Sequence, residues 1–517
     1  MCLTFTNSEM ATSKIPKFEE TTSYPWSSKD GTTFPIYNPA TGKVITNVVA
    51  GTSKEVDLAV KAANEAYSKD WRWRSPSERS GLLFACANEL DKHLDDLAVL
   101  LCLENGKPAS GARQFDLNFL SRIFRYYAGL IDKLPSELYD SGIVYTNVFH
   151  EPYGVVGAIL PFNWPPIHTG GKLAPALAMG NTVVMKPPEQ APLTVMRIIE
   201  ILQGVLPKDV IHGVPGIGPE VPSSLVQHSL VHKISFTGST AAGAAVAKTA
   251  AADVTQCSLE LGGENAFIIF EDADLDQAVR DALDGGFFNK GEACTAASRM
   301  IVHRDVHDVF IERLGAAVKK LVVGDGLKKE THVGPQVSEA QQKRVNNYIR
   351  IGQEEDGATI YSQGNLPSDP ALKDGYFIKP TLFTNVKPHM RIAKEEMFGP
   401  VQTVTSFSTY DEAIEILNDT EYGLTAAVYT KDMEKGWKAC RQIDVGMVWL
   451  NNYWRNVLGK PFGGAKQSGY GREHNIETLR DFSRPKFVQF PSGLGKMPSW
   501  QGVSDIFGPQ GSQVHGA

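Results

Sequence analysis

Residues 155–160 read Val-Val-Gly-Ala-Ile-Leu and are followed at once by Pro161, so that a short apolar run ends abruptly in a turn residue. A run of this length and composition predicts a buried β-strand. Similar runs recur downstream and alternate with helical stretches; they cover residues 182–185, 210–214 and 233–236. This alternation predicts βαβ units and a parallel sheet.

Upstream of this sheet the sequence is mainly helical. Thr52 and Glu55 have the spacing of a capping box, and apolar residues follow it at helical period. Segments 79–103 and 115–134 keep the same period. Residues 143–157 instead alternate and are rich in β-branched side chains, which predicts a hairpin that leads into the strand at 155–160.

A second α/β region extends from about residue 265 to residue 469. Its predicted strands, with helices between them, are residues 266–270, 299–302, 401–407, 425–429 and 447–450. Residues 491–517 are rich in Gly, Pro, Ser and Gln without periodicity, and we expect them to be loosely ordered. The fold class is therefore α/β with parallel sheets.

Length and composition indicate a large globular protein. A chain of 517 residues exceeds what one hydrophobic core usually serves, so we expect two large domains. The net charge of −7 gives no basic footprint for nucleic acid or an anionic membrane surface. No apolar run approaches the roughly 18 residues of a membrane span, and residues 1–22 lack the apolar core of a secretory signal. These features predict a cytoplasmic protein.

The six cysteines form no CxxC pair and show no ligand spacing with histidine, which predicts neither a metal site nor a disulfide framework. Cys294 differs from the others because it follows an apolar segment in the window 287–299, Phe-Phe-Asn-Lys-Gly-Glu-Ala-Cys-Thr-Ala-Ala-Ser-Arg. A free cysteine is most often a small buried hydrophobe. An accessible and polarised small-residue segment is instead the setting of a nucleophilic thiol, so Cys294 is a candidate nucleophile.

Glu260 is the candidate general base. It lies in Leu259-Glu260-Leu261-Gly262-Gly263, at the mouth of a glycine turn. A surface carboxylate would be the default interpretation of any single glutamate. An acid within this apolar run is expected to be partly buried, with a pKa raised toward that of a usable base.

Asn163 follows the strand at 155–160 within Pro161-Phe162-Asn163-Trp164-Pro165-Pro166. An asparagine between prolines is most often a turn residue. Its side-chain amide can also donate to a developing oxyanion, which makes it a candidate for that role.

No GxGxxG sequence follows any strand, so the usual dinucleotide fingerprint is absent. Lys186 and Glu189 nevertheless follow the strand at 182–185, where a carboxylate can hold ribose hydroxyls. Residues 236–243, which include Gly238, Ser239 and Gly243, join a strand to a helix and offer backbone N–H groups to a pyrophosphate. A plain solvated loop is the alternative for Lys186 and Glu189.

In this order the motifs resemble those of the aldehyde dehydrogenase superfamily, continuously from about Tyr37 to Phe490. The resemblance implies that Cys294 is the nucleophile, that Glu260 is the general base, and that Asn163 and the Cys294 backbone N–H bind the oxyanion. It implies NAD as cofactor, with NADP less favoured because Glu189 would repel a 2′-phosphate. Glu264 departs from the lysine that relatives commonly carry.

Further motifs carry the resemblance to the cofactor and the fold. Residues 395–401 resemble the segment that holds the nicotinamide ribose, which assigns that role to Glu396 and Phe398, and Phe162 is placed on the dinucleotide side. Residues 461–473 resemble the glycine-rich loop near the catalytic water, with Glu473 as structural support and a candidate proton relay. The resemblance implies an NAD-binding Rossmann-like domain (15–135 and 153–262) and a catalytic domain (263–477). It also implies a β oligomerisation element (136–152 and 478–492) and terminal extensions (1–14 and 493–517).

The implied reaction is oxidation of an aldehyde to the carboxylic acid by a homodimer or homotetramer. Gly170 and Gly171 stand where many relatives place a bulky residue, so we expect a wide entrance suited to aromatic or medium-chain aldehydes. The candidate lining is Trp164, His168, Gly171, Tyr453, Trp454 and Arg455. Arg455 leaves a semialdehyde dehydrogenase open as the alternative. A CoA-acylating enzyme, a catalytically silent structural member and a cysteine hydrolase are the other rivals.

Overall fold

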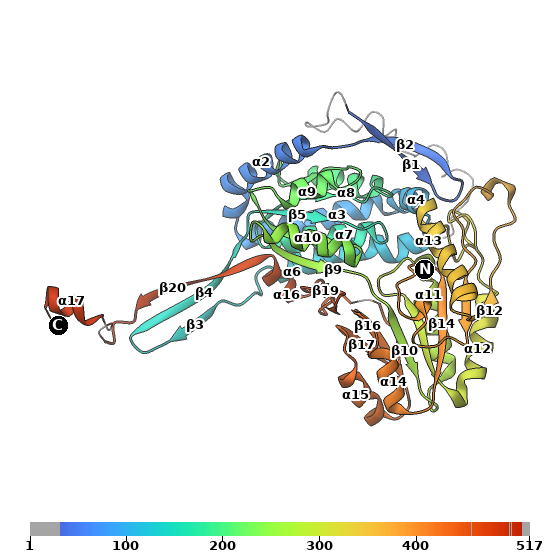
Figure 1. Ribbon diagram of the computed structural model, residues 1–517. Helices are drawn as coiled ribbons and strands as arrows, with labels where there is room; N and C mark the ends of the chain where they lie inside the picture. The colour runs from blue at the N-terminus through green and yellow to red at the C-terminus, as the bar shows by residue number, and fades with distance from the viewer. Residues whose placement is uncertain (1–30, 456, 496, 498, 509–517) are drawn as a thin grey trace.

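The computed structural model describes residues 31–455, 457–495, 497 and 499–508 (Figure 1). Within this part of the chain, two large sheets carry the fold. The first has the strand order β19-β9-β8-β5-β6-β7 and the second has the order β12-β13-β14-β11-β10-β16-β17. In both sheets all neighbours are parallel except one edge strand, β19 or β12. The predicted α/β class with parallel-sheet domains is thereby confirmed.

The strands of the first sheet are β5 (Val155–Ile159), β6 (Thr182–Lys186), β7 (Ile211–Gly213), β8 (Val231–Thr237), β9 (Gln256–Glu260) and β19 (Gly469–Tyr470). Those of the second are β10 (Asn265–Ile269), β11 (Ala297–His303), β12 (Thr359–Gln363), β13 (Thr381–Thr384), β14 (Val401–Phe407), β16 (Thr425–Tyr429) and β17 (Met447–Leu450). Smaller ladders join β1 (Thr33–Asn38) to β2 (Lys43–Val49) and β15 (Tyr422–Gly423) to β18 (Ala465–Lys466).

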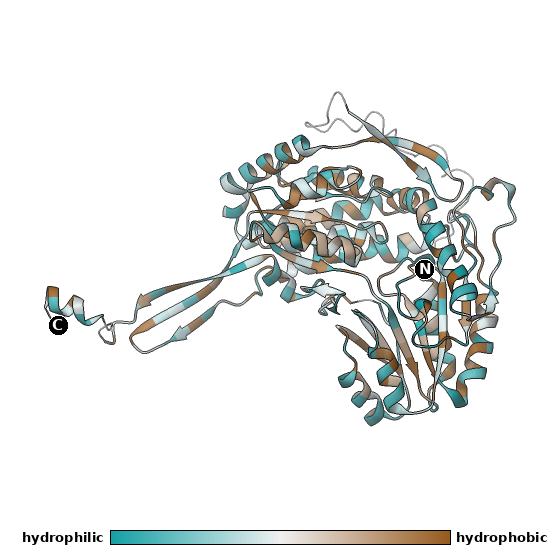
Figure 2. Cartoon of the chain, in the orientation of Figure 1, coloured by the Kyte–Doolittle hydropathy of each residue, from teal (hydrophilic) through white to brown (hydrophobic). Residues whose placement is uncertain are grey.

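Helices cover both faces of each large sheet, because successive side chains of a strand point to opposite faces and both sets are apolar here. In β10, Phe267 and Ile269 pack on one side, and Ala266 and Ile268 pack on the other. Figure 2 shows hydrophobic residues concentrated on the strands and polar residues on the outer helices.

The first sheet packs on one face against α3 (Pro76–Leu90), α4 (Leu94–Asn105), α6 (Asn118–Leu130), α7 (Pro165–Ala178) and α8 (Leu193–Gln203), and on the other against α2 (Ser53–Lys69), α9 (Glu220–Val226) and α10 (Thr240–Ala251). The second packs against α11 (Leu275–Phe287) and α12 (Arg304–Val318) on one face and against α14 (Tyr410–Asn418) and α15 (Met433–Gln442) on the other. The remaining helices are α5 (Ala109–Gly111), α13 (Glu339–Arg350), α16 (Ile476–Asp481) and α17 (Gln501–Phe507).

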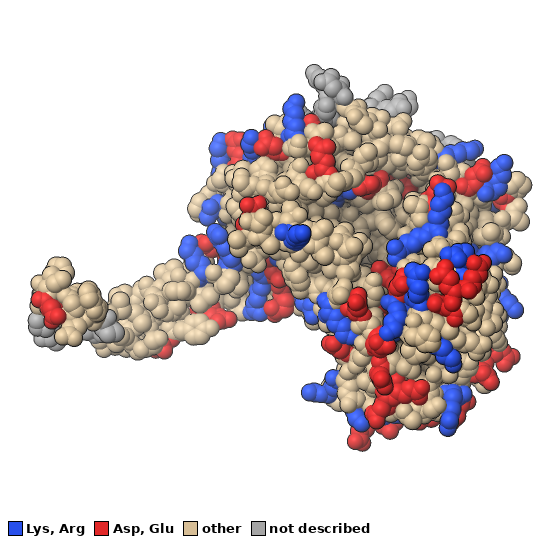
Figure 3. Space-filling model, viewed as in Figure 1, with Lys and Arg blue, Asp and Glu red and all other residues tan. Residues whose placement is uncertain are grey.

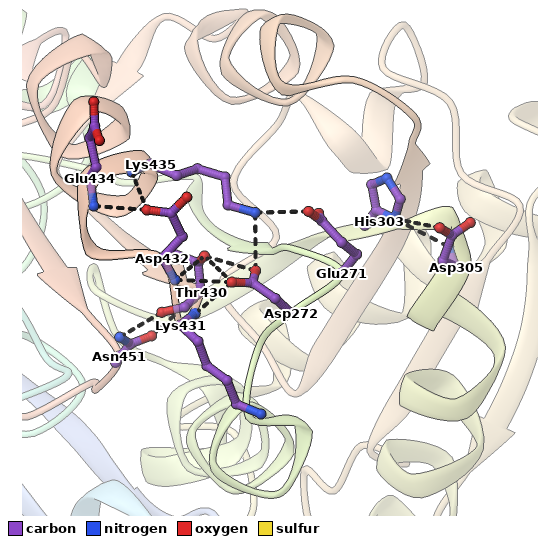
Figure 4. Close-up of polar contacts among 10 residues, drawn as sticks. All are labelled: Glu271, Asp272, His303, Asp305, Thr430, Lys431, Asp432, Glu434, Lys435 and Asn451. Carbon is purple, nitrogen blue, oxygen red and sulfur yellow. Dashed lines mark hydrogen bonds and ion pairs between the residues drawn. The ribbon is translucent and has the colours of Figure 1, made fainter.

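A polar cluster fastens the end of β10 to the turn between β16 and α15 (Figure 4). The Asp272 carboxylate accepts hydrogen bonds from Thr430 Oγ1 at 2.8 Å and from the backbone N–H groups of Lys431 and Asp432 at 2.9 and 3.0 Å. Lys435 Nζ donates to Asp272 at 3.1 Å. These contacts lower the pKa of Asp272 although partial burial opposes this. The cluster lies at the carboxyl end of β10, whereas Cys294 precedes the parallel strand β11 and so lies at the opposite end of the sheet.

An arm projects from the body and consists of β20 (Ser483–Pro491), β4 (Val144–Pro152) and β3 (Glu137–Asp140) in antiparallel order, with α17 at its tip (Figure 1). The predicted hairpin over residues 143–157 is wrong in its boundaries. Residues 144–152 are one strand, and its hairpin partner is the exposed segment Glu137–Asp140. The tail after residue 491, expected to be loosely ordered, contains the helix α17.

Other elements also differ from the prediction. The helix predicted over 79–103 is two helices, α3 and α4, with a short 3-10 turn at Asp91–His93 between them. The capping box of α2 is present, with the Thr52 N–H bonded to Glu55 Oε2 at 2.9 Å. Residues 469–470, assigned to the catalytic range, pair with β9 and therefore belong to the first sheet. The division into domains otherwise stays a prediction, with residues 1–30 and 509–517 outside the described part.

Candidate active site

Cys294 lies in the turn between η4 (Phe288–Gly291) and β11, next to the end of β9. Asn265 Nδ2 donates to the carbonyls of Cys294 and Ala296, both at 2.8 Å, and so fixes the turn. A Cβ atom at Gly263 would lie 2.4 Å from the Cys294 carbonyl oxygen. Only glycine therefore allows the Glu260-Leu261-Gly262-Gly263 turn to approach the cysteine this closely.

Cys294 is half-buried, but the charged groups near its thiol do not favour the thiolate that the sequence led us to expect. Burial, followed by the charges of Glu260 and Glu396, raises the pKa of the thiol well above its usual range. The neighbours that act on it are carboxylates rather than cations. The thiol is therefore protonated in this form and needs a base before it can attack a carbonyl.

Glu260 is the last residue of β9, and its side chain is buried. Neither carboxylate oxygen has a hydrogen-bond partner among the described residues. Burial and the negative charge of Glu473 raise the pKa of Glu260 well above its usual range. An unpaired, buried carboxylate close enough to perturb Cys294 has the properties of a general base.

A buried ion pair lies beside Glu260. Lys172 Nζ on α7 donates to Glu473 Oε1 at 2.8 Å and to Ser235 Oγ at 3.0 Å. Burial opposes ionisation of Glu473, yet the charge and the hydrogen bond of Lys172 hold the pKa of this carboxyl below its usual range. Glu473 therefore stays ionised while Glu260 resists ionisation. The sequence indicates structural support and a candidate proton relay for Glu473, but it carries no signal for Lys172 as its partner.

Asn163 follows β5 and is buried, and its Oδ1 has no hydrogen-bond partner in the described part of the chain. Its backbone carbonyl accepts from Asn289 Nδ2 at 3.0 Å, which also donates to the Glu292 carbonyl at 2.8 Å. Asn289 adopts a left-handed conformation, φ 51°, as does Lys290, φ 56°. Asn289 thus ties the Asn163 segment to the turn that carries Cys294.

The predicted ribose pair lies at the end of β6, with Lys186 as the last residue of the strand and Glu189 just after it. Lys186 is buried, and its Nζ lies 3.6 Å from Glu189 Oε1. The same Glu189 oxygen accepts from the Gly218 backbone N–H at 3.0 Å, so the carboxylate is held at the carboxyl end of the sheet. Burial lowers the pKa of Lys186, and Glu189 offsets part of that effect.

The predicted pyrophosphate segment begins α10. Ser239 is its N-cap, and the Ser239 side chain accepts from the Ala242 N–H at 3.3 Å. A Cβ atom at Gly243 would lie 2.3 Å from Leu261 Cδ2, so this glycine allows α10 to pack on the turn after Glu260. Gly238 receives the Phe236 ring, with Cζ 2.6 Å from its Cβ position. The first turn of α10 contains no acidic residue and leaves backbone donors for an anion.

The predicted nicotinamide-side residues come together from two segments. The rings of Phe162 and Phe398 form an edge-to-face pair with centroids 5.7 Å apart. Glu396 Oε1 accepts from the Gly263 N–H at 2.9 Å, and burial raises the pKa of Glu396 to about 7. Phe398 has a φ of 59°, unusual for a phenylalanine, and its carbonyl accepts from Gln341 Nε2 at 2.7 Å.

An aromatic wall lies next to the catalytic turn. The Trp164 ring contacts Phe115 and Phe288, with centroids 5.4 and 5.6 Å away, and Phe115 stacks on Phe119 at 6.0 Å. Lys107 Nζ lies 3.6 Å from the centroid of the Trp164 ring. Sequence reasoning found Trp164 but missed its partners, because they come from helical segments whose period indicates only burial.

His168 and the two glycines lie on α7. A Cβ atom at Gly170 would lie 2.8 Å from Leu120 Cδ1, so Gly170 serves the packing of α7 on α6. A Cβ atom at Gly171 would lie 3.1 Å from Cε1 of His474, whose ring fills this space. These contacts give no support to the expectation that the two glycines widen an entrance. His168 is buried close to them.

The remaining candidates follow β17. Tyr453 is buried and its hydroxyl bonds to the Thr295 carbonyl, next to Cys294, whereas the Trp454 side chain is 65% exposed. Arg455 is paired with the Asp284 carboxylate at 2.5 Å and lies over the Phe288 ring at 4.4 Å. An arginine that is already neutralised by a protein carboxylate is a poor receptor for a substrate carboxylate.

The Glu260 carboxylate is thus near enough to Cys294 to raise the pKa of its thiol, and Asn289 ties the Asn163 segment to the Cys294 turn. A thiol, an unpaired carboxylate and an amide are the groups that covalent chemistry on a carbonyl requires. No group of three or more His, Cys, Asp or Glu side chains among the described residues is arranged to hold a metal ion. The described part of the chain also contains no helix long and apolar enough to cross a membrane.

Comparison with known proteins identifies the family. Residues 26–488 match the family model described as the aldehyde dehydrogenase family. An aldehyde dehydrogenase of Didymella fabae is 56% identical over 479 residues, 93% of this chain and 96% of that protein. Aldehyde dehydrogenase citD of Monascus ruber is 55% identical over 484 residues, 93% of this chain and 96% of that protein.

A solved structure agrees. Betaine aldehyde dehydrogenase of Staphylococcus aureus, in complex with NAD+, is 38% identical with a TM-score of 0.88 and covers 92% of this chain and 94% of its own. The chain therefore belongs to the aldehyde dehydrogenase family, and the predicted family and fold are confirmed. It is an enzyme that acts on aldehydes.

Proposed function

We propose that the protein oxidises an aromatic aldehyde to the carboxylic acid with NAD, through a covalent adduct on Cys294. The observation that carries this proposal is the unpaired Glu260 carboxylate beside Cys294, with the Asn163 segment tied to the same turn by Asn289. The order of the motifs along the chain and the family membership support it. The rest of the site is consistent with the same chemistry.

The first step is addition of Cys294 Sγ to the carbonyl carbon. Since the pKa of the thiol is raised, Glu260 takes its proton as the C–S bond forms. The carbonyl oxygen gains the electron pair and is stabilised by the Asn163 amide and the Cys294 backbone N–H. Bound NAD supplies the hydride acceptor that turns this adduct into a thioester.

The second step is hydrolysis of the thioester. Before this step Glu260 releases the proton that it took from the thiol, and the adjacent Lys172–Glu473 pair offers a polar route for it. Glu260 then takes a proton from water as the water oxygen attacks the acyl carbon. The C–S bond breaks, the carboxylic acid leaves, and Glu260 returns its proton to the Cys294 thiolate. This hydrolytic role distinguishes the proposed enzyme from a CoA-acylating one. Identifying the product with and without CoA tests the distinction.

The residues present fit NAD. Lys186 Nζ lies 3.6 Å from Glu189 Oε1 and can donate to a ribose hydroxyl, and the Glu189 carboxylate, held by the Gly218 N–H, can accept from one. The N-terminus of α10 can receive a pyrophosphate, and we assign Phe162, Phe398 and Glu396 to the nicotinamide half. The NAD+ complex of the Staphylococcus aureus relative supports the same cofactor.

The aromatic wall supports an aromatic aldehyde over a short aliphatic one. Rings stack favourably on Trp164, Phe115 and Phe288 in offset or edge-to-face geometry. The pairing of Arg455 with Asp284 disfavours the semialdehyde alternative. The test is NADH formation with benzaldehyde, hexanal, acetaldehyde and succinic semialdehyde: we expect benzaldehyde to have the highest kcat/KM. Acetaldehyde or the semialdehyde ranking first would overturn the substrate class, and inactivity with every aldehyde would favour a silent member.

We also propose that the arm mediates assembly into a homodimer or homotetramer in the cytoplasm. Its exposed apolar side chains include Leu138, Tyr139, Phe487 and Phe490, and Figure 3 shows few charges along it. A strand edge left bare in this way would favour aggregation. Light scattering that shows only a 56.5 kDa species would contradict assembly. The five described cysteines are free, which suits a reducing compartment.

A further inference from the structure

Two buried histidines beside the aromatic wall lack hydrogen-bond partners. His168 is 4% exposed and His474 is 3% exposed. Both ring nitrogens of His168, and Nδ1 of His474, have no partner among the described residues. Buried polar atoms are almost always satisfied, because leaving one unpaired costs about 1–3 kcal/mol. These nitrogens therefore indicate a group that binds between them.

The two histidines face the same region as the aromatic wall. On α7, His168 lies one turn after Trp164 and its N–H bonds to the Trp164 carbonyl at 3.1 Å, so the two side chains share a helix face. Gly171 is on that face too, and the missing side chain leaves room for the His474 ring. His474 makes an edge-to-face contact with Phe119 at 5.5 Å, and Phe119 continues the wall through Phe115.

We propose that His168 and His474 form a polar subsite that binds a ring hydroxyl of a hydroxylated aromatic aldehyde. This inference rests on the proposed function and narrows its substrate class. A hydroxyl both donates and accepts, and a neutral imidazole has one donor and one acceptor to match it. A ring that stacks on the wall can therefore place its hydroxyl between the two histidines while the aldehyde carbon reaches Cys294.

Electrostatics favours a neutral hydroxyl over a charged substituent. Burial lowers the pKa of His168 to about 3, and burial also lowers that of His474, so both rings are uncharged at neutral pH. Lys172, which acts on both histidines, is already paired with Glu473. A substrate carboxylate placed here would be repelled by Glu473. A hydroxyl has neither problem.

The experiment compares kcat/KM for benzaldehyde with the three hydroxybenzaldehydes and their methoxy counterparts. We expect one hydroxy isomer to exceed both benzaldehyde and its methoxy counterpart by about 10- to 100-fold, the effect of leaving buried polar groups without partners. In His168→Leu and His474→Phe this ratio should fall toward one. His168→Gln, which keeps a donor and an acceptor, should retain part of it. The matched control is His212→Leu, a buried histidine on β7, which should leave the ratio unchanged.

A binding measurement separates the subsite from the chemistry. In Cys294→Ala, calorimetry should show tighter binding of the preferred hydroxybenzaldehyde than of benzaldehyde, and adding His168→Leu should abolish the difference. Equal kcat/KM for hydroxylated and plain benzaldehydes would overturn the subsite and leave the proposed function standing. A hydroxyl preference that survives both histidine substitutions would also overturn it. If aliphatic aldehydes are the preferred substrates, the proposed aromatic substrate class is wrong. The subsite is then rejected independently if Cys294→Ala binds the hydroxybenzaldehydes and benzaldehyde equally well.

Discussion

Lys172 Nζ lies 2.8 Å from Glu473 Oε1. Both side chains are buried, and the two residues are 301 positions apart in the chain. Because Lys172 keeps Glu473 ionised, a permanent negative charge faces Glu260. The ion pair therefore tunes the base, and the acid side of the pH profile should report it.

We predict that Glu473→Gln moves the acid limb of the kcat profile to lower pH. Burial and the Glu473 charge both raise the pKa of Glu260, and the substitution removes the charge while leaving the positive Lys172. The pKa of Glu260 must then fall, so the base is ionised at lower pH. The measurement is kcat against pH with an aldehyde whose thioester hydrolysis is rate-limiting. Glu477→Gln, at an exposed neighbour paired with Arg480, is the control, and an unmoved limb in Glu473→Gln would contradict the coupling.

Cys294 and Glu260 should fail in different ways. Cys294→Ala is expected to form no NADH while NAD still binds, since the thiol makes the adduct and does not hold the dinucleotide. Glu260→Gln should form about one NADH per active site and then stall. The NADH should form more slowly than in wild type because the thiol has lost its base, and turnover should stop because the thioester is not hydrolysed. A stopped-flow absorbance trace measures NADH formation, and calorimetry measures NAD binding. Full steady-state activity in either variant would reject the assignment.

Glu189 should set the preference for NAD. Its carboxylate is held by the Gly218 N–H, and in the proposed ribose site its charge would repel a 2′-phosphate. Glu189→Gln keeps the hydrogen-bonding shape and removes the charge, so we expect the ratio of kcat/KM for NADP to that for NAD to rise by about tenfold. Glu220→Gln, an exposed carboxylate that accepts from the Ser53 N–H, is the matched control. A wild-type enzyme that uses NADP as well as NAD would contradict this role.

The parallel sheets could be predicted because their strands are apolar on both faces. Residues 401–407, 425–429 and 447–450 are strands with the predicted bounds; the first two are buried, and Met447–Leu450 is a half-buried edge strand whose side chains are all apolar. The strands at Thr359–Gln363 and Glu137–Asp140 were missed because they are edge strands with polar or exposed side chains and carry no such signal. Local pattern indicates burial, and an edge strand has little of it.

The site could be predicted where a motif holds the chemistry within a few residues, as at Cys294, Glu260 and Asn163. The pairs that tune and position these groups could not be predicted. Lys172 with Glu473, and Arg455 with Asp284, join segments whose separation in the chain says nothing of their contact. Likewise, nothing in the sequence around Cys294 indicates the carboxylates that lie near its thiol and help to raise its pKa.

The last prediction concerns Lys107, which positions the aromatic wall. Its Nζ bonds to both carboxylate oxygens of Asp116 at 2.7 Å, and it lies 3.6 Å from the Trp164 ring centroid, with both charged side chains fully buried. Lys107→Met leaves Asp116 as an unpaired buried charge, so we expect the free energy of unfolding to fall by about 3–5 kcal/mol. Chemical denaturation measures this loss.

The double variant Lys107→Met, Asp116→Leu separates stability from positioning. Replacing a buried ion pair with apolar side chains is often neutral, so the stability should largely return. The double variant still lacks the cation over Trp164. A cation–π contact contributes about 0.5 kcal/mol at an exposed site and about 2 kcal/mol at a buried one. We therefore expect kcat/KM for benzaldehyde to stay several-fold below wild type, with an altered near-ultraviolet circular dichroism signal, while the KM for NAD is unchanged. Full recovery of benzaldehyde oxidation together with stability would show that Lys107 serves only to neutralise Asp116.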